Sequence, residues 1–417
     1  METDLHVYID LKGEPHLVGR LWTRRKGRAA SASFEYQEEW LANPLRFALE
    51  PALVLGKDPQ HTLPGRALFG AIGDSAPDRW GRVLLQREER RRAHLEKRAP
   101  HTLSEHDYLL GVSDFTRSGA LRFAREIGGA FLAPGAAAQV PPLVELPKLL
   151  NAAMKIGTEN EGDEDLRLLL APGSSLGGAR PKASVVDKDG QLMIAKFPQS
   201  DDTTRVPLWE ATALKLASLA GITTHTWWVQ EIAARPVLLL RRFDRTDKER
   251  IPFLSAMSML NAIDNEPHSY MELADALRRY GSHPEADCAE LWRRIVFNVL
   301  ISNADDHLRN HGFLYDTARG WRISPAYDLN PVPLDIKPRI LSLAIDEADD
   351  TASLDVALSA ARHFGLKPKA AHEIAREVGN AVAGWRKEAA ALGLKAKEID
   401  RMQSAFEHED LKAAVKL

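Results

Sequence analysis

Apolar and polar positions divide the chain into a β-rich start, a mixed middle and a helical end. Three strand-like runs separated by turn-forming residues predict a β-rich unit over residues 1–130, namely 5–10, 17–22 and 30–34. From about residue 350 the apolar residues recur at helical spacing, which predicts helices at about 354–358, 370–385 and 399–406. The pattern therefore places strands early in the chain and helices late.

One helix is predicted inside the β-rich unit. Ser75-Ala76-Pro77-Asp78 combines a candidate N-cap serine, an aspartate three residues later and a proline in the first turn. The helix would run through Leu84 and Leu85 into the basic stretch Arg87–Arg92. Because glutamates interrupt that stretch, a solvated helix face is favoured over a nucleic-acid patch.

The middle of the chain follows a linker rich in proline, glycine and alanine at 130–142. The pattern then predicts a β-hairpin, a helix and two strands, at 183–196, 209–219, 227–232 and 236–240. Lys196 ends the hairpin, where a kinase carries the strand lysine that contacts nucleotide phosphates. Glu210 lies in the first turn of the helix. It either pairs with Lys196, as a kinase helix glutamate does, or complements the helix dipole.

A glycine-rich stretch, Gly173–Lys182, directly precedes the hairpin. Its three glycines have no Cβ, so backbone N–H groups can approach a phosphate closely. The stretch is neither a Walker A motif nor a regular G-x-G-x-x-G. A plain surface loop is the alternative, and the position of the stretch just before Lys196 favours phosphate binding.

A polar octet, Asn303–Asn310, lies between a predicted buried helix and the predicted strand Gly312–Tyr315. Rigidly held polar loops are frequent places for chemistry. Asp305 precedes Asn310 by five residues, which is the spacing of a kinase catalytic loop. In such a loop the aspartate takes the substrate hydroxyl proton and the asparagine holds Mg²⁺. The spacing is common by chance, so its meaning depends on the rest of the chain.

A second aspartate follows the octet. Asp328 comes 18 residues after Asn310, beyond a predicted strand, turn and strand. A kinase places its second metal-binding aspartate in the same order. Taken alone, Asp328 would be a turn former or an N-cap. Within the octet, Asp306 and His307 are interpreted as structural, since a loop histidine beside a catalytic aspartate more often supports the backbone than binds metal.

Composition narrows the class of protein. The chain has 417 residues, 44% hydrophobic and 27% charged, with a net charge of −3, so nothing global indicates nucleic-acid or membrane binding. Cys288 is the single cysteine, which excludes an intrachain disulfide and a thiolate zinc cluster. No apolar run approaches the roughly 20 residues that span a bilayer, and the start lacks the regions of a signal peptide. A cytoplasmic protein is expected.

Four ordered motifs together resemble the HipA family, which are bacterial serine/threonine kinases acting as toxins of toxin–antitoxin pairs. The motifs are Ser175–Lys182, Arg242-Phe243-Asp244-Arg245, Asn303–Asn310 and Ala326-Tyr327-Asp328. The resemblance also reaches Ala76–Arg82 in the first unit, so it covers most of the chain. Four motifs in order are far more specific than any one of them.

The resemblance implies a role for each matching residue. Asp305 would be the catalytic base, Asn310 and Asp328 the Mg²⁺ ligands, and Lys196 the ATP-phosphate lysine. The other ATP-binding positions would be the loop residues Ser175, Gly177 and Gly178 and the hinge residues Arg241 and Phe243. Family members often carry glutamate where this chain has Arg241, but a hinge reads adenine through its backbone, so ATP binding is expected to survive.

The resemblance also implies a means of self-regulation. Ser175 matches the serine that family members autophosphorylate, which shuts them down. A phosphate there would repel the ATP triphosphate, because it adds about −1.5 to −2 charge. Arg180 or Lys182 could then hold the modified loop away through charge-assisted hydrogen bonds. Ser174 is the alternative acceptor.

The expected fold is therefore α+β, a bilobal protein-kinase-like fold with a β-rich N-terminal subdomain and a mainly helical C-terminal lobe. Its expected domains are the β-rich subdomain at 1–130, an ATP-binding lobe at 143–245 and a catalytic lobe at 246–417. The expected activity is ATP- and Mg²⁺-dependent serine/threonine phosphorylation of a translation protein such as an aminoacyl-tRNA synthetase, with growth arrest as the outcome. The expected partner is an antitoxin that itself binds DNA, with no direct contact of this chain to nucleic acid or membrane.

Two alternatives stay open. One is a pseudokinase that acts as a binding module in an antitoxin complex, against which the intact Asp305, Asn310, Asp328 and Lys196 argue. The other is a metal-dependent phosphohydrolase using Asp305, Asp306 and His307. In that case the glycine-rich stretch and the strand lysine would have no role. No H-x-x-x-H spacing supports a zinc site.

Overall fold

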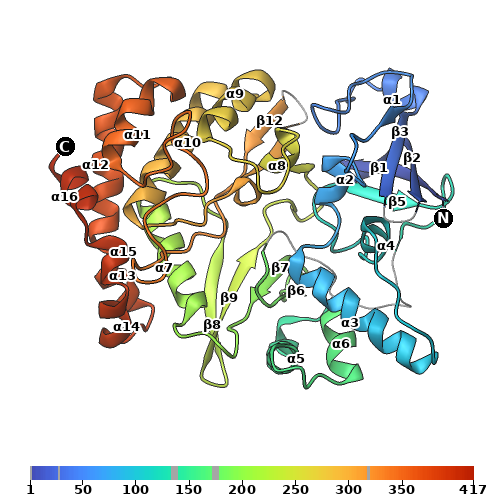
Figure 1. The fold of residues 1–417 in the computed structure, drawn as a ribbon, viewed down its shortest axis with the longest axis horizontal. Helices are drawn as coiled ribbons and strands as arrows, with labels where there is room; N and C mark the ends of the chain where they lie inside the picture. Colours follow the sequence, from blue (N-terminus) through green and yellow to red (C-terminus); the bar gives the residue numbers. More distant parts are fainter. Residues whose placement is uncertain (1, 27–28, 133–139, 171–177, 317–319) are drawn as a thin grey trace. The chain divides into compact units, whose positions relative to one another are not determined.

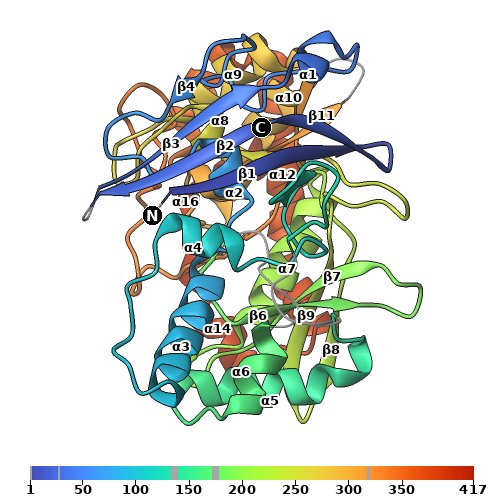
Figure 2. The ribbon, with the colours of Figure 1, turned by 90° about the vertical axis from the view of Figure 1, so that its right-hand side faces the viewer.

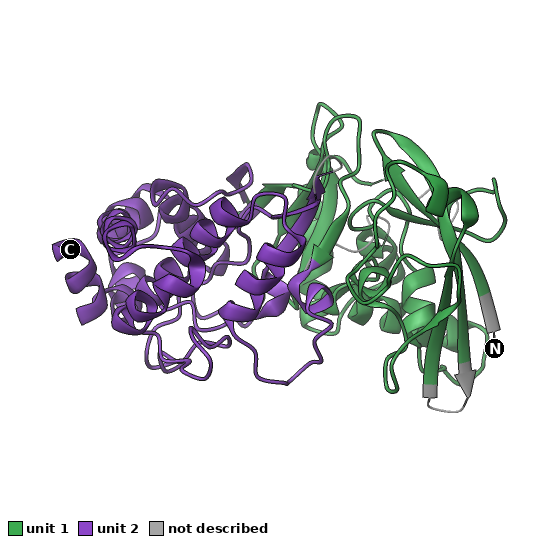
Figure 3. Ribbon diagram, turned by 90° about the horizontal axis from the view of Figure 1, so that it is seen from above, with its two compact units in different colours: residues 1–200, 232–235, 239–254 green, residues 201–231, 236–238, 255–417 purple. Residues whose placement is uncertain are grey.

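The computed structural model describes residues 2–26, 29–132, 140–170, 178–316 and 320–417. The chain divides into two compact units, which Figure 3 distinguishes by colour. Unit 1 comprises 1–200, 232–235 and 239–254, and unit 2 comprises 201–231, 236–238 and 255–417. The three domains expected from the sequence stay a prediction.

Unit 1 begins with a five-stranded antiparallel sheet in the order β4-β3-β2-β1-β5. Its strands are β1 Glu2–Leu11, β2 Glu14–Lys26, β3 Ala29–Tyr36, β4 Gln60–His61 and β5 Leu121–Ala124. Figure 2 shows the long strands β1, β2 and β3 side by side. Lys12 and Gly13 both have positive φ (56° and 82°) and form the two-residue hairpin turn that favours right-twisted strands. The three predicted strands are confirmed.

The strands of this sheet supply much of the core of unit 1. Leu5 is buried at the start of β1, and from Val7 to Leu11 every residue of β1 is buried, so this part of the strand is covered on both faces. The sheet is accompanied by the helices α1 Glu38–Ala42, α2 Gly70–Asp74, α3 Arg79–Leu95 and α4 Glu105–Leu110. Figure 1 labels these elements along the chain.

The start of α3 differs from the prediction. Ser75 is the C-cap of α2 and donates to the carbonyl of Ile72, whereas Asp78 is the N-cap of α3 and accepts from Gly81 N at 2.8 Å. The expected N-cap at Ser75 is therefore wrong by three residues. Aspartate is as good an N-cap as serine, so the local signal did not discriminate between them.

The basic stretch on α3 binds carboxylates of the same unit. Arg87 pairs with Glu161, and Arg91 pairs with Asp163 at the start of α6 (Asp163–Leu170). Glu89 is buried and accepts from Arg92 and Arg98. The stretch is thus neutralised within the protein, and the solvated face expected from the sequence is partly a packed one.

Unit 1 also holds the predicted hairpin, formed by β6 (Lys182–Val186) and β7 (Leu192–Lys196) with Lys182 opposite Lys196. The sheet that contains it has the order β6-β7-β9-β8, and its other strands are β8 Trp227–Ile232 and β9 Arg235–Arg241. Between the linker and the hairpin lie η1 Leu143–Glu145, α5 Leu146–Gly157 and α6. The hairpin and both strands agree with the prediction.

Unit 2 is built around α10 (Pro284–Leu300), the buried helix expected before the polar octet. Leu291, Trp292, Ile295 and Val299 are completely buried on it. It packs against α9, α11 and α12. The small sheet has the order β10-β11-β12, with strands Phe253–Ser255, Gly312–Asp316 and Gly320–Ile323. The bounds of the remaining elements are α7 Val206–Leu219, α8 Ala256–Met259, α9 Tyr270–Tyr280, η2 Leu308–Asn310, α11 Leu354–Ala360, η3 Ala361–Phe364, α12 Pro368–Ala383, α13 Trp385–Ala391, α14 Ala396–Arg401, α15 Gln403–Phe406 and α16 Glu409–Lys416.

Two features of unit 2 refine the predictions. Helix α7 starts three residues before Trp209, because Pro207 lies in its first turn, where the missing N–H has no cost. Trp209 lies beside Trp385 and Phe406, and these last two rings stack at 4.5 Å.

None of the helices in the described part of the chain is long and apolar enough to cross a membrane.

Candidate active site

The octet forms a loop in which exposed and buried side chains alternate. Asp305, His307 and Arg309 are exposed, whereas Ala304, Asp306, Leu308 and Asn310 are buried. Ser302, which enters the loop from α10, has a left-handed backbone (φ 52°), which is uncommon outside glycine and frequent at functional sites. The Asp305 side chain is 69% exposed and is therefore accessible to a substrate.

The loop is held from beneath by the buried carboxylate of Asp306. It accepts from the hydroxyl of Tyr270, from Asn298 Nδ2 at 2.8 Å and contacts His311 Nε2 at 2.8 Å. Burial alone would raise the pKa of Asp306, but the charge of His311 and the hydrogen bonds from His311 and Tyr270 outweigh it and lower that pKa. Burial and the neighbouring Asp306 raise the pKa of Tyr270 well above its ordinary value. Asp306 is thus an ionised anchor of the loop.

Asp306 has the structural role expected of it, but His307 does not. His307 is exposed, and its carbonyl accepts from Asn310 N at 2.8 Å. The histidine that supports the loop is His311, which was not predicted from the sequence. Its position directly after the octet was the available signal.

Asn310 is buried and fixed within the loop. Its Nδ2 donates to the carbonyl oxygen of Asp305 at 3.1 Å. This bond fixes the orientation of the amide group, and the amide oxygen is the atom that could bind a cation. Asn310 lies in the short helix η2. The residues at the two ends of the D-x-x-x-x-N spacing are therefore in direct contact.

Asp328 lies on a turn that is tied to the octet. Its φ is +59°, in the left-handed region that aspartate tolerates better than most residues. Tyr327 donates its hydroxyl to the carbonyl of Arg309 at 2.8 Å, and Asn330 N donates to Asn303 Oδ1 at 3.4 Å. The turn that carries Asp328 is thus connected to both ends of the octet, and it places a carboxylate after the β11–β12 hairpin as expected.

The side chains of this loop suit a magnesium ion bound together with phosphate. Asn310 and Asp328 offer an amide oxygen and a carboxylate, and Mg²⁺ is commonly held by one or two such groups plus substrate phosphates. Among the described residues, no group of three or more His, Cys, Asp or Glu side chains could hold a metal by itself. The oxygen donors therefore fit Mg²⁺ that arrives with a nucleotide.

In unit 1, the end of the glycine-rich stretch is fixed by Lys182. Its side chain is 2% exposed, and its ammonium pairs with Asp78 at 2.9 Å and donates to the carbonyl of Gly178 at 3.0 Å. Trp80 Nε1 donates to the Lys182 carbonyl at 2.9 Å. These bonds connect the Ala76–Arg82 motif to the glycine-rich motif. Lys182 is therefore buried and paired with Asp78 in this structure. Its predicted contact with a phosphate on Ser175 stays a prediction, because Ser175 lies outside the described residues.

The structure describes only some of the other residues that were predicted to bind the nucleotide. Gly178 is exposed with φ +91°, a conformation that requires glycine. Ser174, Ser175 and Gly177 lie outside the described residues. Lys196 ends β7 half-buried, and Glu210 is buried on α7. Their pairing stays a prediction.

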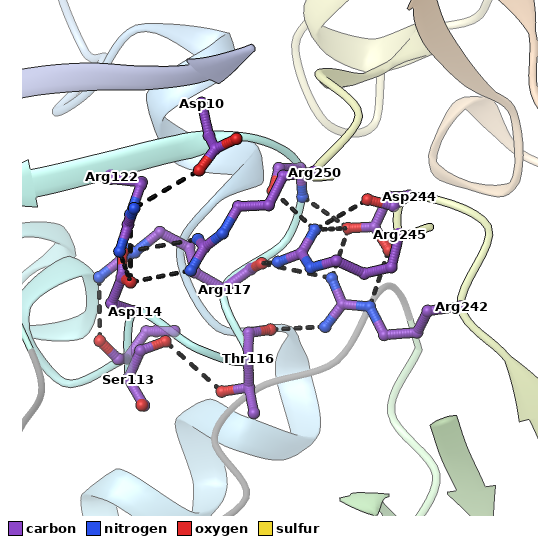
Figure 4. A network of polar contacts seen from close by, with 12 residues as sticks. Asp10, Ser113, Asp114, Thr116, Arg117, Arg122, Arg242, Asp244, Arg245 and Arg250 are labelled. Atoms are coloured by element: carbon purple, nitrogen blue, oxygen red, sulfur yellow. Dashed lines mark hydrogen bonds and ion pairs between the residues drawn. The ribbon is translucent and has the colours of Figure 1, made fainter. Parts of the chain in front are cut away.

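The predicted hinge is the start of a buried polar network in unit 1 (Figure 4). Arg241 is exposed and lies 3.7 Å from Asp187, and the ring of Phe243 lies beside Phe253. Arg242 and Asp244 are fully buried as an ion pair. Arg242 Nη1 also donates to the carbonyl of Thr116 at 2.6 Å. Alternate residues of the hinge therefore point outward and inward.

Asp244 is the centre of this network. It accepts from Arg242, from Arg245 Nη1 at 2.9 Å and from Gly119 N at 2.7 Å. Burial would raise the pKa of Asp244, but the charges of Arg242 and Arg245 outweigh it and lower that pKa to about 2. Asp244 thus attaches the Arg242–Arg245 motif to the segment before β5.

The network continues around a second carboxylate, Asp114, which pairs with Arg122 at 2.7 Å and with Arg250 at 2.8 Å. Arg117 is buried beside it and donates to the carbonyls of Ser75, Leu109 and Val112. Burial lowers the pKa of Arg117 to about 9, so it remains charged at neutral pH. No local pattern in the sequence predicts this network, because its members are far apart in the chain.

The loop, the hairpin after it and the second aspartate follow one another in the order found in a protein kinase, and the fold is of the kinase-like α+β class that was predicted. A family model described as HipA-like C-terminal domain matches residues 174–385, just over half of the chain. The chain belongs to this HipA-like family.

The curated relatives that match this chain are named as kinases. The chain is 28% identical over 195 residues to "Putative kinase Y4mE" of Sinorhizobium fredii, a match covering 40% of this chain and 43% of that protein. It is 30% identical over 144 residues to a "Putative kinase" of Haemophilus influenzae, covering 31% and 39%. These matches span less than half the length of either relative.

One solved structure is similar over nearly the whole chain. It is the complex of HipA, HipB and operator DNA from Shewanella oneidensis, whose matching chain has a TM-score of 0.62 and 16% identity, with 98% of this chain and 96% of that chain covered. At this identity the likeness establishes the fold, and the fold class expected from the sequence is confirmed.

Proposed function

We propose that this chain is an ATP- and Mg²⁺-dependent serine/threonine protein kinase. The observation that supports the proposal best is the octet. Asp305 is exposed at its surface, Asn310 contacts the Asp305 backbone, and the turn of Asp328 is bound to the same loop. Phosphoryl transfer requires positioned groups and charge neutralisation more than a protein nucleophile, and this loop provides positioned groups.

Each residue has one task in the proposal. Asp305 orients a substrate hydroxyl and accepts its proton, while Asn310 and Asp328 would hold Mg²⁺. Lys196 would contact the phosphates of ATP, and the backbone at Arg241 and Phe243 would contact adenine. Bound Mg-ATP supplies the phosphoryl group and neutralises part of its charge.

Self-regulation and partners extend the proposal. Autophosphorylation at Ser175 would lower ATP affinity, and Arg180 or Lys182 would hold the modified loop through charge-assisted hydrogen bonds. The partner would be a DNA-binding antitoxin, an idea that draws support from the Shewanella HipA solved with HipB and operator DNA. The substrate would be a translation protein such as an aminoacyl-tRNA synthetase, phosphorylated in the cytoplasm.

The two alternatives fit less well. A phosphohydrolase would use Asp306 directly, but its carboxylate is buried beneath the loop and bonded to Tyr270, Asn298 and His311. A pseudokinase would not need Asp305, Asn310 and a strained Asp328 turn to be kept in one connected arrangement.

Mg-ATP is expected to raise the melting temperature of the unphosphorylated protein. A ligand at 100 times its Kd adds about 2.7 kcal/mol of stability when it binds the folded state alone. Differential scanning fluorimetry of the wild type, of Lys196→Met and of Lys188→Met would test this. Lys188 is exposed in the hairpin turn of the same sheet, so its variant should shift like the wild type, whereas Lys196→Met should shift much less. Absence of any shift at millimolar Mg-ATP would favour the pseudokinase.

A further inference from the structure

Lys337 lies beside the proposed catalytic base, although it follows Asp305 by 32 residues in the sequence. Its Nζ donates to the carbonyl of Ala304 at 2.8 Å and lies 3.4 Å from Asp305 Oδ1. The lysine side chain is 38% exposed. A cation therefore contacts both the backbone of the octet and the exposed carboxylate of Asp305.

The position of Lys337 is set by its own backbone. Ile336 N and Lys337 N both donate to the carbonyl of Pro333, at 2.9 and 3.3 Å, and form a tight turn. Ser342 Oγ donates to the same Ala304 carbonyl at 3.0 Å. The segment after the Asp328 turn is thus bonded to the Ala304 carbonyl of the octet through both Lys337 and Ser342.

We propose that Lys337 is a positioning residue for phosphoryl transfer, which keeps the Asp305 carboxylate in the orientation that receives the substrate hydroxyl. This inference rests on the proposed kinase function. An ammonium has three donors, of which one binds Ala304 and one points to Asp305. The third donor is left for a negatively charged group that approaches Asp305. A fixed positive charge stabilises a transition state best when it is aimed at the place where negative charge develops.

The exposure of the pair separates this role from a structural one. Ion pairs between exposed side chains contribute little to folding stability, and Ser342 still donates to the Ala304 carbonyl when Lys337 is replaced. Replacing Lys337 should therefore change the melting temperature little. Misplacing a reacting group by about 1 Å can lower a rate on the order of 10²-fold. A loss of rate without a loss of stability is therefore the expected signature.

The test restores the charge chemically. Lys337→Cys is expressed, and treated with 2-bromoethylamine to create an aminoethyl cysteine that has nearly the length and charge of lysine. Iodoacetamide treatment provides the neutral adduct. The natural Cys288 is 3% exposed, so treated wild type reports any effect of its alkylation. Lys412→Met is the matched control, because Lys412 is also an exposed lysine paired with a carboxylate, Glu409.

Transfer of labelled phosphate from Mg-ATP to the chain and to casein, a general acceptor, is then measured. The expected result is a kcat on the order of 10²-fold lower for Lys337→Cys, with KM for ATP unchanged, recovery after aminoethylation and none after the neutral adduct. Equal kcat in Lys337→Cys and Lys412→Met, or no recovery after complete aminoethylation, would overturn the role of Lys337. If the wild type itself transfers no phosphate, the proposed kinase function fails instead.

Discussion

Replacing Asp305 by alanine is expected to remove nearly all phosphate transfer and to leave the fold intact. A positioned general base contributes roughly 10²–10⁴-fold to a rate, and the Asp305 side chain is 69% exposed, so its removal opens no cavity. Asp328→Ala should cost at least as much, because it removes a proposed Mg²⁺ ligand. The measurement is initial-rate transfer of labelled phosphate by purified protein, with melting temperature recorded for each variant.

An exposed aspartate elsewhere in unit 2 provides the control. Asp355 lies in the first turn of α11 and is exposed, so Asp355→Asn should retain the wild-type rate. Asp305→Ala protein that transfers phosphate as fast as wild type would show that the proposed mechanism is wrong. A loss of rate accompanied by a lower melting temperature would call for Asp305→Asn, which keeps the volume of the side chain.

Asp244→Ala is expected to be among the most destabilising single substitutions in unit 1. Its carboxylate is fully buried between Arg242 and Arg245, and removing one member of a buried ion pair typically costs 3–5 kcal/mol because the remaining charge is uncompensated. For a unit of this size the corresponding fall in melting temperature is on the order of 10 °C. Asp247, exposed on the same segment, is the control, and Asp247→Ala should change little.

The same residue predicts a pH dependence. The pKa of Asp244 is lowered to about 2 in the folded protein, compared with about 3.9 for an unfolded chain. Its contribution to stability is therefore fully present above about pH 4 and is lost as the pH falls toward 2. Urea unfolding between pH 6 and 2 should show this acid loss in Asp247→Ala but a smaller one in Asp244→Ala. Identical acid dependence in both variants would contradict the assignment.

Local patterns predicted the elements that carry the candidate site. Two short apolar runs on either side of the turn at 187–190 predicted the β6–β7 hairpin with Lys196 at its end, and the helical spacing before residue 300 predicted α10. These predictions succeeded because strand and helix periodicities depend on neighbours in the sequence. The N-cap of α3 was missed because Ser75 and Asp78 carry equivalent local signals.

Contacts between distant segments could not be predicted in this way. Tyr270 and Asp306 are 36 residues apart, Asp305 and Lys337 are 32 apart, and Asp78 and Lys182 are 104 apart. Each pair depends on tertiary packing, which no periodicity encodes. The Asp306 anchor also shows that the two adjacent aspartates of the octet have opposite environments, one exposed and one buried, which their identical chemistry conceals.

The partner of Lys182 is another long-range contact. Lys182 was considered in the sequence only as a possible partner of a phosphate, and in the structure its ammonium is paired with Asp78 and bonded to Gly178. Lysine is rarely buried without a partner, so the sequence signal was the aspartate of the Ala76–Arg82 motif. The two motifs act as one structural connection in unit 1.

The most direct test of the central claim is a phosphoproteomic comparison of cells that express the wild type with cells that express Asp305→Ala at the same level. We expect new phosphoserine or phosphothreonine sites in the wild-type cells, in a small set of proteins that includes a translation protein, together with a phosphopeptide of this chain that contains Ser175. None of these sites should appear with Asp305→Ala. Indistinguishable phosphoproteomes, with the wild-type protein folded and present, would contradict the proposal that this chain is a protein kinase.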